Sequence, residues 1–257
     1  MIKKLFRACL ILFVVPTLAS AAWSYADGWP RSYRHADWSS TGIAPDPSVE
    51  REAIVQIYAA RAGRWKGVFG VHTWIALKPA GSGRFERYEV VGWGTPVRRN
   101  KHPVDGRWYG NAPAIVRDIR GPLAARLIPQ IRSSISRYPA NRRGDYRVWP
   151  GPNSNTFVAW IAREFPALQI ELPPTAVGKD YLGSGFEIAR TPSATGWQFS
   201  IAGAFGAALA RKEGFELHVL GATLGLDLEE LAIKLPSIGT IGLLTGTGHA
   251  HSRTGQP

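Results

Sequence analysis

Three apolar stretches in the first half of the chain have the composition of β-strands. Ile54 to Ala59, Val68 to Lys78 and Phe85 to Trp93 are rich in β-branched and aromatic residues. The segments between them, 63–67 and 79–83, are short and contain glycine. Because short loops join antiparallel neighbours, these stretches predict an antiparallel meander.

A helical period replaces the strand pattern after residue 112. Pro113 to Ile119 and Pro122 to Tyr138 are predicted helices, and Pro129 is expected to kink or split the second one. Another helix is predicted from about Asn155 to Phe165, and Pro166 ends it. The apolar positions at helical spacing in the second stretch are Leu123, Leu127, Ile128, Ile131 and Ile135.

The last third of the chain alternates between apolar and polar residues. Trp197 to Ala202, Phe215 to Val219 and Ile233 to Leu235 have a period of two, and glycines punctuate the segments between them. The pattern predicts a strand-rich extension that packs on the preceding core, with glycines at bends or bulges. His249 and His251 lie in a polar tail, where we expect no metal site.

The N-terminus has the three parts of a secretory signal peptide. Basic residues in Met1 to Arg7 precede an uncharged stretch, Ala8 to Leu18, and the small residues Ala19 to Ala21. The apolar stretch is shorter than the roughly 20 residues of a spanning helix, so we expect cleavage and export to the periplasm or cell envelope. Retention as an uncleaved anchor is the alternative. Trp23, Trp29 and Trp38 follow in an irregular arm and are expected to pack on the domain.

These patterns give a division of the chain into five parts. The predicted parts are a signal peptide (1–21), an irregular arm (22–52), a core (53–181), a strand-rich extension (182–246) and a flexible tail (247–257).

Composition and charge narrow the classes of function. The chain has 257 residues, 45% of them hydrophobic, which predicts a sizeable buried core. The only cysteine, Cys9, lies in the predicted signal peptide. One cysteine excludes an internal disulfide, a cysteine-rich zinc site and an iron–sulfur cluster, and no cofactor is indicated. The net charge is +12, and losing Lys3, Lys4 and Arg7 would reduce it to +9. Export argues against nucleic acid as the partner and favours an anionic membrane surface or envelope polymer. The alternative is that the basic surface serves only solubility.

The segment Asn153 to Phe157 places a serine at a predicted helix start, directly after a Pro-Gly-Pro break. A nucleophile at Ser154 would gain from free backbone N–H groups and from the positive end of the helix dipole, because both stabilise an oxyanion. Asn153, Ser154 and Asn155 are also ordinary N-capping residues, so the same segment is consistent with a purely structural role.

His72 interrupts an apolar strand and needs a hydrogen-bond partner there. It is either a satisfied core histidine or a general base. Glu89 and Tyr88 lie on the next predicted strand and are the nearest candidates to orient its ring.

Taken together, the two features resemble the circularly permuted papain-like superfamily, which includes NlpC-type peptidases, lecithin retinol acyltransferase-like enzymes and deSUMOylating isopeptidases. His72-Thr73 and Asn153-Ser154-Asn155-Thr156-Phe157 are similar to the His-Thr strand and Asn-Cys-Asn-Thr-Phe helix of its permuted peptidases. The resemblance implies an α+β, permuted papain-like core of an antiparallel sheet plus helices. It also implies that Ser154 stands where those enzymes have cysteine. A serine hydroxyl stays neutral and requires base assistance.

A second resemblance covers most of the chain that follows the predicted signal peptide. The segments that carry it are 71–75, 88–93, 105–110, 149–157 and 173–181. They resemble the bacterial family of unknown function numbered 3750. That resemblance implies relatives but no activity.

We therefore expect an exported hydrolase or acyltransferase that acts on an amide or ester, in a cell-wall peptide or a lipid. Ser154 would be the nucleophile, His72 the base and Glu89 its orienter. The residues expected to position the oxyanion or bind substrate are Asn153, Asn155, Trp74, Tyr88, Trp108 and Tyr109. Two alternatives stay open: a non-catalytic envelope protein that keeps the cleft for binding, and a membrane-surface protein whose segment 197–244 lies against lipid.

Overall fold

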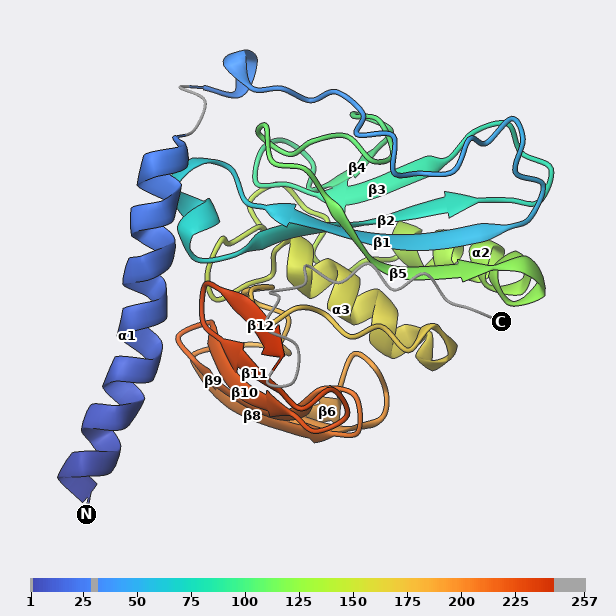
Figure 1. The fold of residues 1–257 in the computed structure, drawn as a ribbon. Coiled ribbons are helices and arrows are strands. Elements are labelled where there is room, and N and C mark those ends of the chain that lie inside the picture. The colour runs from blue at the N-terminus through green and yellow to red at the C-terminus, as the bar shows by residue number, and fades with distance from the viewer. Residues whose placement is uncertain (1, 29–31, 243–257) are drawn as a thin grey trace.

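The computed structural model describes residues 2–28 and 32–242, which form three α-helices and two antiparallel sheets (Figure 1). The predicted α+β class is confirmed, as is a C-terminal region rich in strands. His249 and His251, in the tail where we expect no metal site, lie outside the described residues. Within residues 2–28 and 32–242, no group of metal-ligating side chains comes together.

The first sheet has five strands in the order β4-β3-β2-β1-β5. Its strands are β1 (Ile54–Arg61), β2 (Val71–Lys78), β3 (Glu86–Val90), β4 (Val97–Arg99) and β5 (Ala114–Arg120). The predicted meander corresponds to β1, β2 and β3, each antiparallel to the next. The prediction of a helix over Pro113 to Ile119 is wrong. These residues form β5, which pairs with β1 from Ala59↔Ala114 to Ile54↔Arg120 and so satisfies backbone groups that β1 would otherwise leave open.

Two helices cover one face of this sheet. They are α2 (Gly121–Ser136) and α3 (Ser154–Glu164). Their apolar residues, including Ile128, Ile131 and Phe157, pack with Ile57 and Ile75 in one buried cluster. Pro129 was expected to kink or split its helix, yet α2 is not split there, because buried neighbours on either side hold the helix on the sheet.

The second sheet contains seven strands, each hydrogen-bonded to the next in sequence order. Its strands are β6 (Phe186–Arg190), β7 (Gly196–Ile201), β8 (Phe205–Ala210), β9 (Gly214–Val219), β10 (Ala222–Asp227), β11 (Ala232–Leu235) and β12 (Gly239–Gly242). Three 3-10 turns complete the described structure: η1 (Tyr33–His35), η2 (Arg64–Val68) and η3 (Pro166–Leu168).

The seven-stranded sheet faces the rest of the molecule with its polar side. Glu216 is buried between two cations, 2.8 Å from Lys179 Nζ and 3.1 Å from Lys234 Nζ. The Lys234 Nζ atom also lies 2.7 Å from Glu171 Oε1. Because Lys179 and Glu171 precede the sheet in sequence, this buried ionic cluster joins the extension to the core. Removing one partner of such a desolvated ion pair strongly destabilises the folded protein, because the other charge stays buried without a partner.

The N-terminal helix α1 (Ile2–Asp27) is longer than the sequence suggested. It includes residues 22–27, which were expected to be irregular, and leaves the Trp23 side chain 76% exposed rather than packed. Trp38 does pack against a buried aromatic cluster, whereas Trp29 lies outside the described residues. By length and composition alone, residues 10–27 of α1 are apolar enough to cross a membrane. A signal sequence has the same properties.

Candidate active site

The start of α3 is fixed by a complete set of capping hydrogen bonds. Asn153 is the N-cap, and its Oδ1 atom accepts from the backbone N–H groups of Asn155 (2.9 Å) and Thr156 (3.1 Å). Thr156 Oγ1 in turn accepts from the Asn153 backbone N–H. This reciprocal arrangement is a capping box. The prediction that Ser154 lies at a helix N-terminus is therefore confirmed, and capping is performed by Asn153 rather than by Ser154.

Hydrogen bonds also hold the start of α3 against β2, the strand that carries His72. The Thr73 hydroxyl lies 3.0 Å from Asn155 Oδ1 and 3.2 Å from the Ser154 carbonyl oxygen. The Asn155 carboxamide donates to the backbone oxygens of Val71 and Val177. These contacts fix the backbone of Ser154 next to the strand of the candidate base.

Asn153 and Asn155 were expected to donate hydrogen bonds to an oxyanion, but both side-chain amides donate to backbone carbonyl oxygens instead. Asn153 Nδ2 donates to Val148 and Val177 carbonyl oxygens at 3.0 Å, so both amide groups are engaged by the backbone. The Ser154 backbone N–H, in contrast, has no hydrogen-bond partner among the described residues. It is the first N–H of α3 and is available to an anion.

His72 is held by a buried carboxylate. Its Nε2 atom lies 3.1 Å from Glu89 Oε2, and Arg87 Nη2 lies 2.7 Å from the same oxygen. The contact follows from the sheet register: Trp74 pairs with Glu89, so His72, two residues earlier on β2, projects from the same face as Glu89. Since a carboxylate only accepts hydrogen bonds, the Nε2 atom carries the proton and Nδ1 is the basic atom.

The environment favours neutral imidazole beside an ionised carboxylate. Burial lowers the pKa of His72, although Glu89 acts in the opposite direction. Burial alone would raise the pKa of Glu89, but the hydrogen bond with His72 and the charge of Arg87 outweigh it and hold the pKa at about 2. A neutral imidazole with its Nε2–H directed at a carboxylate has the tautomer and orientation of a general base.

Aromatic rings fix the plane of the imidazole. The His72 ring stacks on Trp108 with the centroids 3.7 Å apart and the planes 10° from parallel. Trp38 contacts Trp108 edge-on and stacks on His102. The ring of His72 is therefore held by Glu89 at one edge and by an indole against one face.

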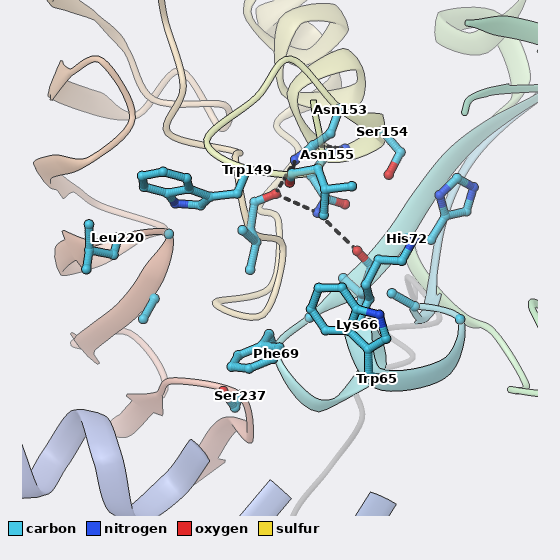
Figure 2. Close-up of a pocket in the computed structure, with 18 of the residues that line it drawn as sticks. Trp65, Lys66, Phe69, His72, Trp149, Asn153, Ser154, Asn155, Leu220 and Ser237 are labelled. Atoms are coloured by element: carbon cyan, nitrogen blue, oxygen red, sulfur yellow. Dashed lines mark hydrogen bonds between the residues drawn. The ribbon is translucent and has the colours of Figure 1, made fainter. Parts of the chain in front are cut away.

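His72 and Ser154 line the same cavity, which has a volume of about 560 Å³ (Figure 2). Most of its wall is apolar. The apolar wall includes Trp65, Phe69, Trp93, Val148, Trp149, Val177 and Leu220, and α1 adds Phe13, Val14 and Leu18. The Ser154 side chain is largely buried, and its hydroxyl has no hydrogen-bond partner among the described residues, His72 included. A hydroxyl, a free N–H group and a basic nitrogen are thus available around one apolar space.

The other predicted residues divide into two groups. Trp108 and Tyr109 line the cavity, as expected for substrate contacts. Trp74 and Tyr88 do not: Trp74 is fully buried beneath the Arg87 guanidinium, 3.9 Å from its ring centroid, and the Tyr88 hydroxyl donates to Glu86. Of the two candidates to orient His72, the structure brings Glu89 to the ring and not Tyr88.

Sequence reasoning missed Arg87, Thr73 and the contribution of α1. Arg87 had a detectable signal, because residues two apart on a strand share a face and Arg87 therefore lies beside Glu89. Thr73 was recognised only as part of a motif, and its link to Asn155 depends on how α3 packs on β2. The α1 wall had no signal in the sequence, since it joins residues more than forty positions apart.

Comparison with curated proteins and with solved structures gives no match to this chain. Comparison with protein families gives one match, to a family described as "Protein of unknown function (DUF3750)", over residues 52–181. The matched region begins just before β1 and ends after α3, so it contains the five-stranded sheet, Glu89 and both His72 and Ser154. The chain belongs to the DUF3750 family.

Proposed function

We propose that this protein is an exported hydrolase or acyltransferase in which Ser154 is the nucleophile, His72 the general base and Glu89 the residue that orients His72. The observation that carries the proposal is that Ser154 and a buried, carboxylate-bound His72 line one cavity. The order of a histidine strand followed by a nucleophile helix supports a permuted papain-like arrangement with serine in place of cysteine.

The proposed reaction uses only groups already at the cavity. Ser154 Oγ attacks the carbonyl carbon of an ester or amide while His72 Nδ1 accepts the hydroxyl proton. The oxyanion is stabilised by the Ser154 backbone N–H at the positive end of α3. The imidazolium then gives its proton to the leaving alcohol or amine, and Glu89 stabilises its charge. Water, or a second alcohol or amine, attacks the acyl-serine and completes hydrolysis or transfer.

The wall of the cavity favours a substrate with a fatty acyl chain over a cell-wall peptide. A peptide from the cell wall carries charged groups that need partners, whereas the side chains along the cavity are mainly aromatic and aliphatic. We therefore place the reaction on a lipid-like ester or amide in the envelope, and the periplasm is its proposed location.

A serine-directed fluorophosphonate tests the nucleophile directly. We expect the intact protein to become labelled and Ser154→Ala to lose the label. Ser136→Ala is the matched control, because Ser136 lies on the exposed side of α2 away from the cavity. Labelling of Ser154→Ala equal to that of the intact protein would contradict the proposal.

A second candidate function is a non-catalytic binding protein that uses the same cavity. It is favoured by one observation: among the described residues, no hydrogen bond joins the Ser154 hydroxyl to His72. In that case the fluorophosphonate would leave the intact protein unlabelled. A fluorescent fatty acid would still bind, and Ser154→Ala would bind it equally well.

A further inference from the structure

We propose that the outer face of the seven-stranded sheet docks on a lipid bilayer that contains anionic head groups. The outer face comprises the side chains of β7 to β11 that point away from the core, and every one of them is apolar. The most exposed of them are Trp197, Ile201, Phe205, Leu209, Phe215 and Leu226. A sheet with one face in water normally presents polar residues there, and a continuous apolar face marks an interaction surface.

The strand register makes this orientation unambiguous. Leu209 pairs with Phe215, and Phe215 with Leu226, so apolar residues of three adjacent strands lie in one row. Between them, Glu216 and Lys234 point inward and are fully paired in the buried ionic cluster. Shifting a strand by one residue would turn its charged side chains to the outer face, away from their ion-pair partners, and would turn its apolar side chains inward. The polar inner face and the apolar outer face therefore require each other.

In the unprocessed chain, the N-terminal helix points to a bilayer as the surface that covers this face. α1 contacts β10 and β11, and its Thr17 hydroxyl lies 3.1 Å from that of Ser237, between β11 and β12. Figure 1 shows that α1 continues past the seven-stranded sheet on the side away from the five-stranded sheet. Its exposed residues include Leu10, Ile11 and Val15, which precede the Thr17 contact in the chain. The apolar helix and the apolar sheet thus face the same side.

Charge and the edge of the sheet favour anionic lipid. The chain has a net charge of +12, and an anionic membrane surface attracts basic proteins. At the edge strand β6, the Arg190 guanidinium lies over the Trp197 ring, 4.3 Å from its centroid. A cationic group beside an exposed indole matches the boundary between acyl chains and head groups, where tryptophan is stabilised and arginine reaches phosphate.

The cavity lies at the margin of the outer face. Val219 points outward on β9 and also lines the cavity, and Leu220 lines it while remaining 65% exposed. One further step rests on the proposed function: an acyl chain would pass from the bilayer to Ser154 along Val219 and Leu220. Docking of the sheet does not depend on that reaction.

A fluorescent label on the outer face tests the docking. In the full chain with Cys9→Ser, Leu209→Cys is labelled with bimane, and Ala125→Cys on the exposed side of α2 serves as the matched control. The proteins are mixed with vesicles of phosphatidylglycerol and phosphatidylcholine with brominated acyl chains. We expect the label at 209 to lose most of its emission and to become shielded from aqueous iodide, while the label at 125 keeps its emission and stays accessible to iodide.

Further measurements distinguish docking of the sheet from membrane insertion of α1. Membrane insertion of α1 would bring the whole domain near the vesicle, so Leu226→Glu, in the same cross-strand row as position 209, is added. We expect it to restore most of the emission at 209. Replacing phosphatidylglycerol with phosphatidylcholine should weaken quenching several-fold. Two results would overturn the proposal: continued access of iodide to position 209 on vesicles, or shielding of that position without vesicles in a chain that elutes as a dimer, since a second copy would then cover the face.

Discussion

The Nε2 atom of His72 and the Oε2 atom of Glu89 are 3.1 Å apart, and both side chains are buried on one face of the five-stranded sheet. They come from adjacent strands at diagonal positions, so the contact is set by backbone register and not by a flexible loop. The Arg87 guanidinium lies on the same carboxylate and keeps it ionised. Glu89 is therefore the residue on which the charge balance of the candidate site depends.

Glu89→Gln should destabilise the protein strongly, because it leaves the buried Arg87 cation without its anion. We expect the free energy of unfolding to fall by about 3–5 kcal/mol, as for other buried pairs that lose one partner. Urea denaturation measures the change. Glu86→Gln is the matched control on the same strand. Its partners Arg99 and Arg132 are partly exposed, so its loss should be nearer ~1 kcal/mol. Equal losses in the two variants would contradict the assignment of Glu89 as the buried counter-ion.

Ser154→Ala and His72→Ala should each abolish ester hydrolysis to a similar degree if the two residues act as a unit. The double variant should be scarcely slower than either single one, because a unit that has lost one member gains nothing from the other. Hydrolysis of a fatty-acid nitrophenyl ester measures the rates. Ser154→Cys should retain or raise activity, since a thiol forms its thiolate readily beside a histidine.

The stability of Ser154→Ala distinguishes chemistry from capping. Asn153 performs the capping, so removing the Ser154 hydroxyl should cost well under the ~1 kcal/mol typical of an N-cap. Asn153→Ala, measured in the same thermal melts, should cost at least that amount. Additive stability losses in the serine and histidine variants, with unchanged activity and fatty-acid binding, would exclude the pair as a functional unit.

Stability should fall as the pH decreases below about 6.5, the ordinary pKa of histidine in an unfolded chain. Burial lowers the pKa of His72 and of His218 in the folded protein. The unfolded chain therefore binds more protons between the lowered value and 6.5, and the free energy of unfolding rises with pH there by at most about 1.4 kcal/mol per pH unit for each histidine. Urea denaturation across this range measures the slope.

A variant of His72 and the carboxylate of Glu89 complete the pH prediction. His72→Gln should reduce the slope. The contribution of Glu89 belongs to a lower window. Its pKa of about 2 lies below the ordinary value of 4.5, so that contribution is complete above 4.5 and is lost as the pH falls towards 2. A slope that His72→Gln does not alter would contradict burial of a neutral His72.

Removal of the predicted signal peptide should open the cavity. Cleavage after Ala21 would remove Phe13, Val14 and Leu18, which form one wall. We expect protein from an envelope fraction to begin near Ala22 by N-terminal sequencing. An apolar fluorescent probe should bind this processed form several-fold more tightly than the full chain. Intact Met1 in cytosolic material would contradict export, and equal probe binding would contradict the role of α1 as a wall.

The sequence by itself determined the local structure wherever side-chain pattern and backbone agree. The β-branched and aromatic composition of residues 54–93 predicted the first three strands. The alternation in 197–202, 215–219 and 233–235 predicted β7, β9 and β11 of the second sheet. The Pro-Gly-Pro break placed Ser154 at the start of α3. These features depend on neighbours along the chain, which a sequence pattern records directly.

Only the tertiary structure decided the features that depend on which segments meet. Residues 114–120 are a strand because β1 offers them an open edge, although their own pattern suggested a helix. The alternation of the last sheet did not reveal which face points inward. Lys179 and Glu171, outside the sheet, supply the charges that draw Glu216 and Lys234 into the interior, and the apolar face is thereby left outside. The same long-range packing placed α1 on the cavity of His72 and Ser154.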